Sequence, residues 1–127
     1  MNPQWILLEV IKVAHQAQLE EHGGSPGIRD EGALLSALAR PENLFAYGTP
    51  TLFELATAYA GGIVRNHPFV DGNKRTGFLE AFIFLHINGY VLQASEAEAV
   101  VMTLGFASRE LDETLYAKWL EDNCIKS

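Results

Sequence analysis

The sequence is poor in cysteine and in positive charge. Its single cysteine, Cys124, rules out an internal disulfide framework and fits a reducing compartment, and we interpret it as a small apolar filler near the C-terminus. Nine Lys and Arg stand against 16 Asp and Glu, which gives a net charge of -7. Such an acidic chain is a poor binder of nucleic acids and of anionic membrane surfaces. We therefore expect no direct nucleic-acid binding by this chain alone.

Long apolar runs and linkers are also missing. No apolar stretch reaches the about 18 residues that a membrane span requires, and we find no signal peptide, internal repeat or low-complexity tract. With 127 residues, of which 48% are hydrophobic, the chain predicts one domain over residues 1–127 with a sizeable core. We expect a cytoplasmic protein with no membrane partner.

The residues that carry chemistry gather in one stretch, residues 66–77. An almost wholly apolar run follows it, with hydrophobic residues on nearly every side of a period of about 3.6 residues. This pattern predicts a central helix, about residues 72–88, that is buried on most faces and ends at Asn88-Gly89. The polar cluster at its N-terminal end comprises His67, Asp71, Gly72, Asn73, Lys74 and Arg75.

A helix start of this composition predicts an anion site. The first turn has unpaired N–H groups and the positive end of the helix dipole. We expect Gly72 to let a phosphate approach the backbone and Lys74 and Arg75 to add charged donors. Asp71 is placed to hold Mg²⁺ beside a phosphate, and His67 can accept a proton from a hydroxyl near neutral pH. The alternative is an ordinary capped loop with solvated charges.

The first half of the chain predicts three further helices. The first is expected from Gln4 to about His22, with Asn2-Pro3 as its start, and the second from Asp30 to Arg40-Pro41. The segment 42–50 is then either a plain connection or a mobile flap beside the site. A capping box at Thr51 opens the third helix. The residues expected to be buried are Ile6, Leu7, Val10, Val13, Ala14 and Ala17, then Leu34, Leu35 and Leu38, then Leu52, Leu55, Tyr59 and Ile63.

The second half predicts two more helices. One opens with a capping box at Ser95, and the last runs from about Arg109 to Asn123 with Ser108 as its cap. The segment 90–92 is too short to predict a strand. The residues expected to be buried in the last helix are Leu111, Leu115, Trp119 and Leu120. The fold class is therefore all-α, a compact bundle of about six helices around the buried central helix.

The motif His67-Pro68-Phe69-Val70-Asp71-Gly72-Asn73-Lys74-Arg75 resembles the Fic/Doc superfamily. The match is closest to the death-on-curing branch, toxins of toxin–antitoxin modules. The stretches 23–30 and 37–41 and the chain length also resemble that branch. The resemblance covers nearly the whole chain and implies an all-helical single domain. The spacing of Gly72, Lys74 and Thr76 does not fit the P-loop.

The residue at position 74 distinguishes the two activities that the resemblance implies. Most superfamily members have glycine there and transfer AMP from ATP to a protein hydroxyl, whereas the Asn-Lys-Arg version resembles the branch that transfers the γ-phosphate. A lysine fills space that glycine leaves for a diphosphate, so the nucleotide would bind reversed with its terminal phosphate at the reaction centre. The implied reaction is phosphorylation of a Ser or Thr of a target protein, elongation factor Tu by resemblance, which blocks translation.

The resemblance also implies residue roles and partners. His67 would be the general base, and Asp71 would organise the site through Mg²⁺ or by orienting a neighbour. ATP phosphates would be held by Gly72, Asn73, Lys74 and Arg75, and Arg65 either contacts the nucleotide or is an exposed helix-end cation. The implied partner is a cognate antitoxin of the prevent-host-death type, whose flexible tail folds onto the toxin. Two alternatives stay open: an AMP transferase and a non-catalytic antitoxin-binding module.

Overall fold

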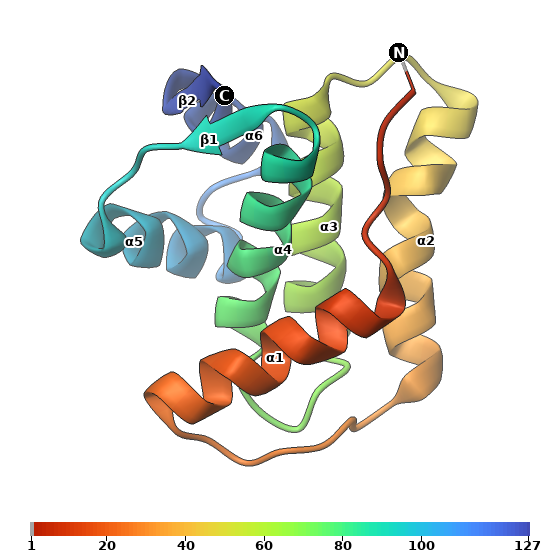
Figure 1. The fold of residues 1–127 in the computed structure, drawn as a ribbon, viewed down its shortest axis with the longest axis vertical. Helices are drawn as coiled ribbons and strands as arrows, with labels where there is room; N and C mark the ends of the chain where they lie inside the picture. The colour runs from red at the N-terminus through yellow and green to blue at the C-terminus, as the bar shows by residue number, and fades with distance from the viewer. Residues whose placement is uncertain (1) are drawn as a thin grey trace.

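The computed structural model describes residues 2–127, and within them it has six helices and one two-stranded sheet (Figure 1). This confirms the predicted all-α bundle. The sheet pairs the ends of two segments far apart in sequence, with Val91 opposite Ile125 in antiparallel register. None of the described helices is both long and apolar enough to cross a membrane. The elements are α1 (Leu8–His22), α2 (Glu31–Tyr47), α3 (Leu52–Asn66), α4 (Asn73–Ile87), β1 (Tyr90–Leu92), α5 (Glu96–Ala107), α6 (Glu113–Asp122) and β2 (Cys124–Lys126).

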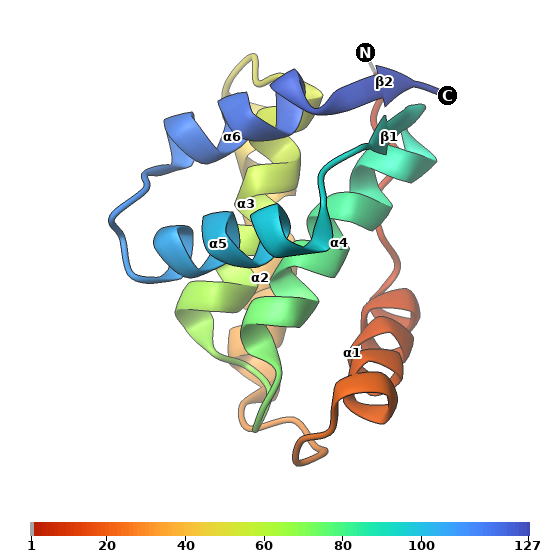
Figure 2. The same ribbon diagram turned by 90° about the vertical axis from the view of Figure 1, so that its left-hand side faces the viewer.

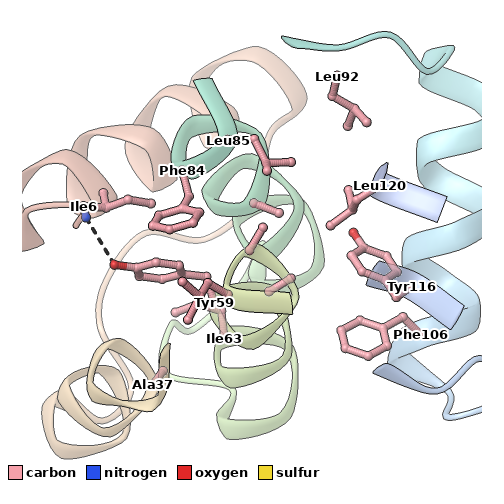
Figure 3. Close-up of a cluster of buried hydrophobic side chains, with 14 of the residues drawn as sticks. Ile6, Ala37, Tyr59, Ile63, Phe84, Leu85, Leu92, Phe106, Tyr116 and Leu120 are labelled. Atoms are coloured by element: carbon pink, nitrogen blue, oxygen red, sulfur yellow. Dashed lines mark hydrogen bonds between the residues drawn. The ribbon is translucent and has the colours of Figure 1, made fainter. Parts of the chain in front are cut away.

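Helices α3 and α4 form the centre of the bundle. The two views show α2 flanking this pair on one side, α5 and α6 on the other, and α1 across its lower end (Figures 1 and 2). The predicted central helix is confirmed, because α4 runs over 73–87. Tyr59 and Phe84 meet in the core with ring centroids 5.1 Å apart (Figure 3). On the other side of α3, Phe106 stacks on Tyr116 at 4.5 Å.

The small residues of α3 let two helices approach it closely. A Cβ added to Gly77 of α4 would lie 3.1 Å from the carbonyl oxygen of Ala60, so a strip of small residues, Ala56, Ala60, Gly61 and Gly62, lets α4 pack closely on α3. Gly62 faces α2 instead, since a Cβ there would lie 3.0 Å from Ala37. The strip therefore fixes α3 against both neighbours.

The predicted start and buried face of the first helix are wrong. Helix α1 begins at Leu8, and the residues before it run extended along the core, where the Ile6 N–H donates to the Tyr59 hydroxyl at 3.1 Å (Figure 3). The expected stripe is largely exposed, with Leu7, Val10 and Val13 at 67%, 39% and 68%. The buried residues of α1 are Ile11, His15, Gln18 and Leu19. His15 and Gln18 are polar, and both are buried because they contact the loop between α3 and α4.

The predicted end of the second helix is also wrong. Helix α2 continues through Pro41 to Tyr47, so most of the segment 42–50 is helical and neither a plain loop nor a flap. Pro41 is buried, and its burial outweighs the backbone hydrogen bond that proline cannot make. Leu35, expected to be buried, is 51% exposed.

The last helix starts later than predicted. Helix α6 begins at Glu113, where the Asp112 carboxylate caps it by accepting the Leu115 N–H at 2.8 Å, and Ser108 is not its cap. Trp119 and Leu120 are buried as expected, whereas Leu115 is 51% exposed and Tyr116 is buried instead.

One core residue of α4 is a carboxylic acid. Glu80 is 0% exposed, and neither of its carboxyl oxygens has a hydrogen-bond partner in the described chain. Burial raises its pKa well above the ordinary 4.5, because an apolar environment disfavours the charged form. Glu80 is therefore protonated in the folded state at pH values where it is ionised in the unfolded chain.

We predict that Glu80 makes stability fall as pH rises. Above pH 4.5 the unfolded state loses this proton and the folded state keeps it, so ionisation favours unfolding up to the folded pKa. Glu80→Gln, which mimics the protonated acid, is expected to match the wild type near pH 4.5 and to become more stable than it at higher pH. The difference should grow by up to about 1.4 kcal/mol per pH unit. Urea unfolding of both proteins across this range checks it, and a constant difference would contradict it.

Candidate active site

The loop between α3 and α4 carries the predicted site. Its two ends both have left-handed backbone conformations: His67 closes α3 with φ 53°, and Gly72 opens α4 with φ 78°. The His67 N–H still donates to the Ile63 carbonyl at 3.1 Å, which ties the loop to α3. The chain therefore reverses within a few residues and points the start of α4 back along the pair.

The segment that follows α1 straps this loop, and the two lie side by side in both views (Figures 1 and 2). The Val70 N–H donates to Gly27 at 3.0 Å, and the Arg29 N–H donates to the Pro68 carbonyl at 2.7 Å. The Arg29 guanidinium donates to the carbonyls of His67 and Asn66 at 2.7 and 2.9 Å. Arg29 thus satisfies the backbone carbonyls at the end of α3 and the start of the loop.

The polar buried face of α1 holds the same loop. His15 Nε2 donates to the Asp71 carbonyl at 2.8 Å. Its ring stacks on Phe69 with centroids 3.8 Å apart and an interplanar angle of 10°. Phe69 is 1% exposed and anchors the loop in the core, as expected. His15 is 5% exposed because its contacts are with the motif.

Asn73 positions the histidine. The Asn73 amide oxygen accepts the Phe69 N–H at 3.0 Å, and its Nδ2 donates to the Phe69 carbonyl at 3.0 Å. These two bonds fix the amide, so the same Nδ2 also donates to His67 Nδ1 at 3.1 Å. His67 Nε2 therefore remains available to a ligand in the cavity, which His67 lines. The Asn73 side chain, expected to hold phosphate oxygens, has no donor left for them, and only its backbone N–H can do so.

Asp71 is an exposed carboxylate at the start of α4. One of its oxygens accepts the Ser25 N–H at 3.2 Å, and the other accepts the Gly72 N–H at 2.8 Å. These bonds, with smaller contributions from the charges of His15 and Arg75, hold the pKa of Asp71 below its usual 3.8. Asp71 is therefore ionised at neutral pH.

These residues open on one cavity of about 860 Å³ between α1, α4 and α5. His67, Asp71, Lys74 and Arg75 line its polar end, so the structure brings together most of the predicted site. The rest of the lining is mainly apolar and includes Phe78, Phe82 and Ile83 of α4 and Val100 and Leu104 of α5.

The cavity offers a cation only part of a coordination shell. In the described chain no cluster of three or more His, Cys, Asp or Glu side chains could hold a metal ion. One ionised carboxylate, Asp71, beside a helix start still fits Mg²⁺, which usually takes one or two carboxylates together with substrate phosphates and water.

Arg65, expected either to contact the nucleotide or to be an exposed helix-end cation, lies outside the cavity lining. Its Nη1 donates to Glu113 at 2.7 Å, and its guanidinium lies 4.6 Å from the centroid of the Phe106 ring. Arg40 pairs with the same carboxylate. Arg65 is thus held where α3 meets α5 and α6.

The space beside Gly72 is filled from α1. A Cβ added to Gly72 would lie 2.0 Å from Gln18 Nε2, so glycine is required here for a side chain of the protein as well as for its φ of +78°. Gln18 and His15 do not belong to the site that the sequence predicts. The signal was present, because polar residues three apart share a helix face, but the apolar stripe of α1 outweighed it.

The fold and site define an all-helical protein in which a helix start with two cations, a histidine and a carboxylate line one open cavity. The chain belongs to the Fic/DOC family, whose model matches residues 5–85. It is 34% identical over 113 residues to a protein named Protein kinase doc from Escherichia phage P1, a match covering 88% of this chain and 89% of that protein. It is 47% identical over 75 residues to a Toxin Doc from Mycolicibacterium smegmatis, a match covering 57% of each chain.

We predict that Gly72→Ala destabilises the protein more than Gly89→Ala. Both glycines follow or precede a helix with positive φ, 78° and 94°, but nothing lies within 4 Å of a Cβ at Gly89. The shared backbone strain should cost about 1–2 kcal/mol, and displacing Gln18 should add about 1–3 kcal/mol at Gly72. Urea unfolding of the two variants measures the difference. Equal losses would show that Gln18 moves aside freely.

Proposed function

We propose that this protein is the toxin of a toxin–antitoxin module and transfers the γ-phosphate of ATP to a Ser or Thr hydroxyl of a target protein. The relatives named Toxin Doc and Protein kinase doc support this proposal. The observation that carries it is the open start of α4, where Lys74, Arg75 and His67 line one cavity. By resemblance the target is elongation factor Tu, so the protein would block translation in the cytoplasm.

The start of α4 would hold the phosphates. Its first-turn N–H groups and the side chains of Lys74 and Arg75 supply donors and positive charge where negative charge is spread in the transition state. Mg²⁺, held by Asp71 and by phosphate oxygens, would neutralise further charge. Transfer forms a bond between the acceptor oxygen and the γ-phosphorus and breaks the bond to ADP, which leaves.

His67 would take the proton of the acceptor hydroxyl through Nε2. Because the Asn73 amide donates to Nδ1, the neutral ring at rest has its proton on Nε2. Proton removal at Nε2 requires the other tautomer, so the contact with Asn73 has to loosen when the substrates bind. Catalytic hydrogen bonds often reach their final geometry only in the complex with substrate.

AMP transfer is the second candidate, since the motif differs from that of AMP transferases at Lys74. Lys74 is exposed and lines the cavity at its polar end, where it would occupy the space for a diphosphate. This favours the reversed nucleotide and the γ-phosphate as the transferred group.

We predict that His67→Ala loses transfer and toxicity but keeps nucleotide binding. The loss of a positioned base should lower the rate by about 10²–10⁴-fold. The matched control is His86→Ala, an exposed histidine of α4 outside the cavity lining, which should keep full activity. Incubation of candidate targets with α- or γ-labelled ATP measures the reaction. Label from α-labelled ATP alone would reject the kinase, and unchanged toxicity of His67→Ala would leave only a non-catalytic binding module.

The apolar part of the cavity would receive a segment of the antitoxin. It adjoins the polar end along α4 and α5, so a bound segment there would also cover the phosphate site. Disordered tails that fold on binding use such grooves. The antitoxin would be of the prevent-host-death type expected from the resemblance.

We predict that Val100→Asp escapes neutralisation by the antitoxin. Val100 is 47% exposed and lines the cavity, so a carboxylate there would be buried by an apolar segment at a cost of several kcal/mol. The control is Val101→Asp, at 67% exposure and outside this cavity. Growth of cells expressing each variant with the antitoxin checks this. Equal neutralisation of both variants would place the antitoxin elsewhere.

A further inference from the structure

The amide of Gln18 is buried without a partner. Gln18 is 3% exposed, and neither Nε2 nor Oε1 makes a hydrogen bond in the described chain. A buried polar group left unsatisfied costs about 1–3 kcal/mol, and almost all buried amides in folded proteins are paired. The fold of α1 gives no reason for this amide, since an apolar side chain of the same length would fill the same space.

The position of Gln18 suggests a reason. Its Nε2 lies against the Cα of Gly72, where a Cβ would come within 2.0 Å, and Gln18 lines the same cavity as Lys74 and Arg75. The backbone N–H groups of residues 73–75 also lack partners among the described hydrogen bonds, whereas the Thr76 N–H is already bonded to Gly72. The residue with the unpaired amide and the helix start with unpaired N–H groups therefore line the same cavity.

This part of the cavity suits an anion. The first turn of α4, with the N–H groups of residues 73–75 and the side chains of Lys74 and Arg75, lines the cavity together with Gln18. No protein hydrogen bond fixes the orientation of the buried Gln18 amide. The amide can therefore turn its NH₂ group toward a negatively charged oxygen. A carboxylate could not serve there, because it would be repelled by the same anion.

We propose that Gln18 binds the nucleotide by donating a hydrogen bond from Nε2 to a phosphate oxygen at the start of α4. This rests on the proposed function, and it adds to the motif a residue from a different helix. The buried amide is unsatisfied in the free protein and is satisfied by the ligand. Its cost to stability is therefore recovered on binding.

The test is Gln18→Met, which keeps length and apolar contacts but cannot hydrogen-bond. Titration calorimetry with Mg-ATP, and separately with inorganic tripolyphosphate, should show binding weakened about ten- to a hundredfold, the usual effect of one hydrogen bond to a charged group. Thermal unfolding should occur at the same or a higher temperature, because an unsatisfied amide has been removed. Gln18→Glu should weaken binding further.

The matched control is Gln16→Met, since Gln16 lies on the exposed face of α1 and bonds only Glu20 at 3.4 Å. It should bind both ligands as the wild type does. If Gln18→Met binds as tightly as the wild type, the inference fails and the proposed function stands. If it unfolds at a lower temperature, the amide serves the fold and the inference fails. If the wild type itself binds neither ligand, the proposed function fails first.

Discussion

The open start of α4 depends on how the loop before it is held. Residues outside the loop satisfy several of its backbone groups. The Val70 N–H and the Pro68 carbonyl form hydrogen bonds with the segment after α1, and the Asp71 carbonyl accepts a hydrogen bond from His15. The loop therefore needs none of the first-turn N–H groups of α4 for itself. These groups have no partner among the hydrogen bonds of the described chain, and their residues line the cavity, where the helix dipole and two cations add to them.

The same requirement decides how α1 packs. Burying the apolar stripe of α1 would have removed His15 from Asp71 and Gln18 from Gly72. The helix instead buries Ile11 and Leu19 together with these polar residues and leaves Leu7 and Val13 in solvent. Exposing single apolar side chains has a modest cost, since much of any protein surface is apolar. The contacts with the motif loop therefore determine the orientation of α1.

The hydrophobic pattern and the motif predicted the centre of this protein well. Helices α3 and α4 are apolar on most faces, so their positions followed from periodicity, and the capping box at Thr51 located a helix start. Prediction failed where tertiary packing overrode a local sequence rule. Proline disfavours a continuing helix by its own stereochemistry, but Pro41 is buried and α2 continues past it to Tyr47.

The sequence by itself determined that one polar cluster would stand at the start of a buried helix, because spacing along a chain fixes which groups a helix N-terminus presents. Tertiary structure alone decided which of those groups remain free. It commits the Asn73 amide to Phe69 and His67, turns Arg65 to Glu113, and brings Gln18 from α1 to Gly72. The physical reason is that a hydrogen bond uses a donor up, and its partner can come from anywhere in the chain.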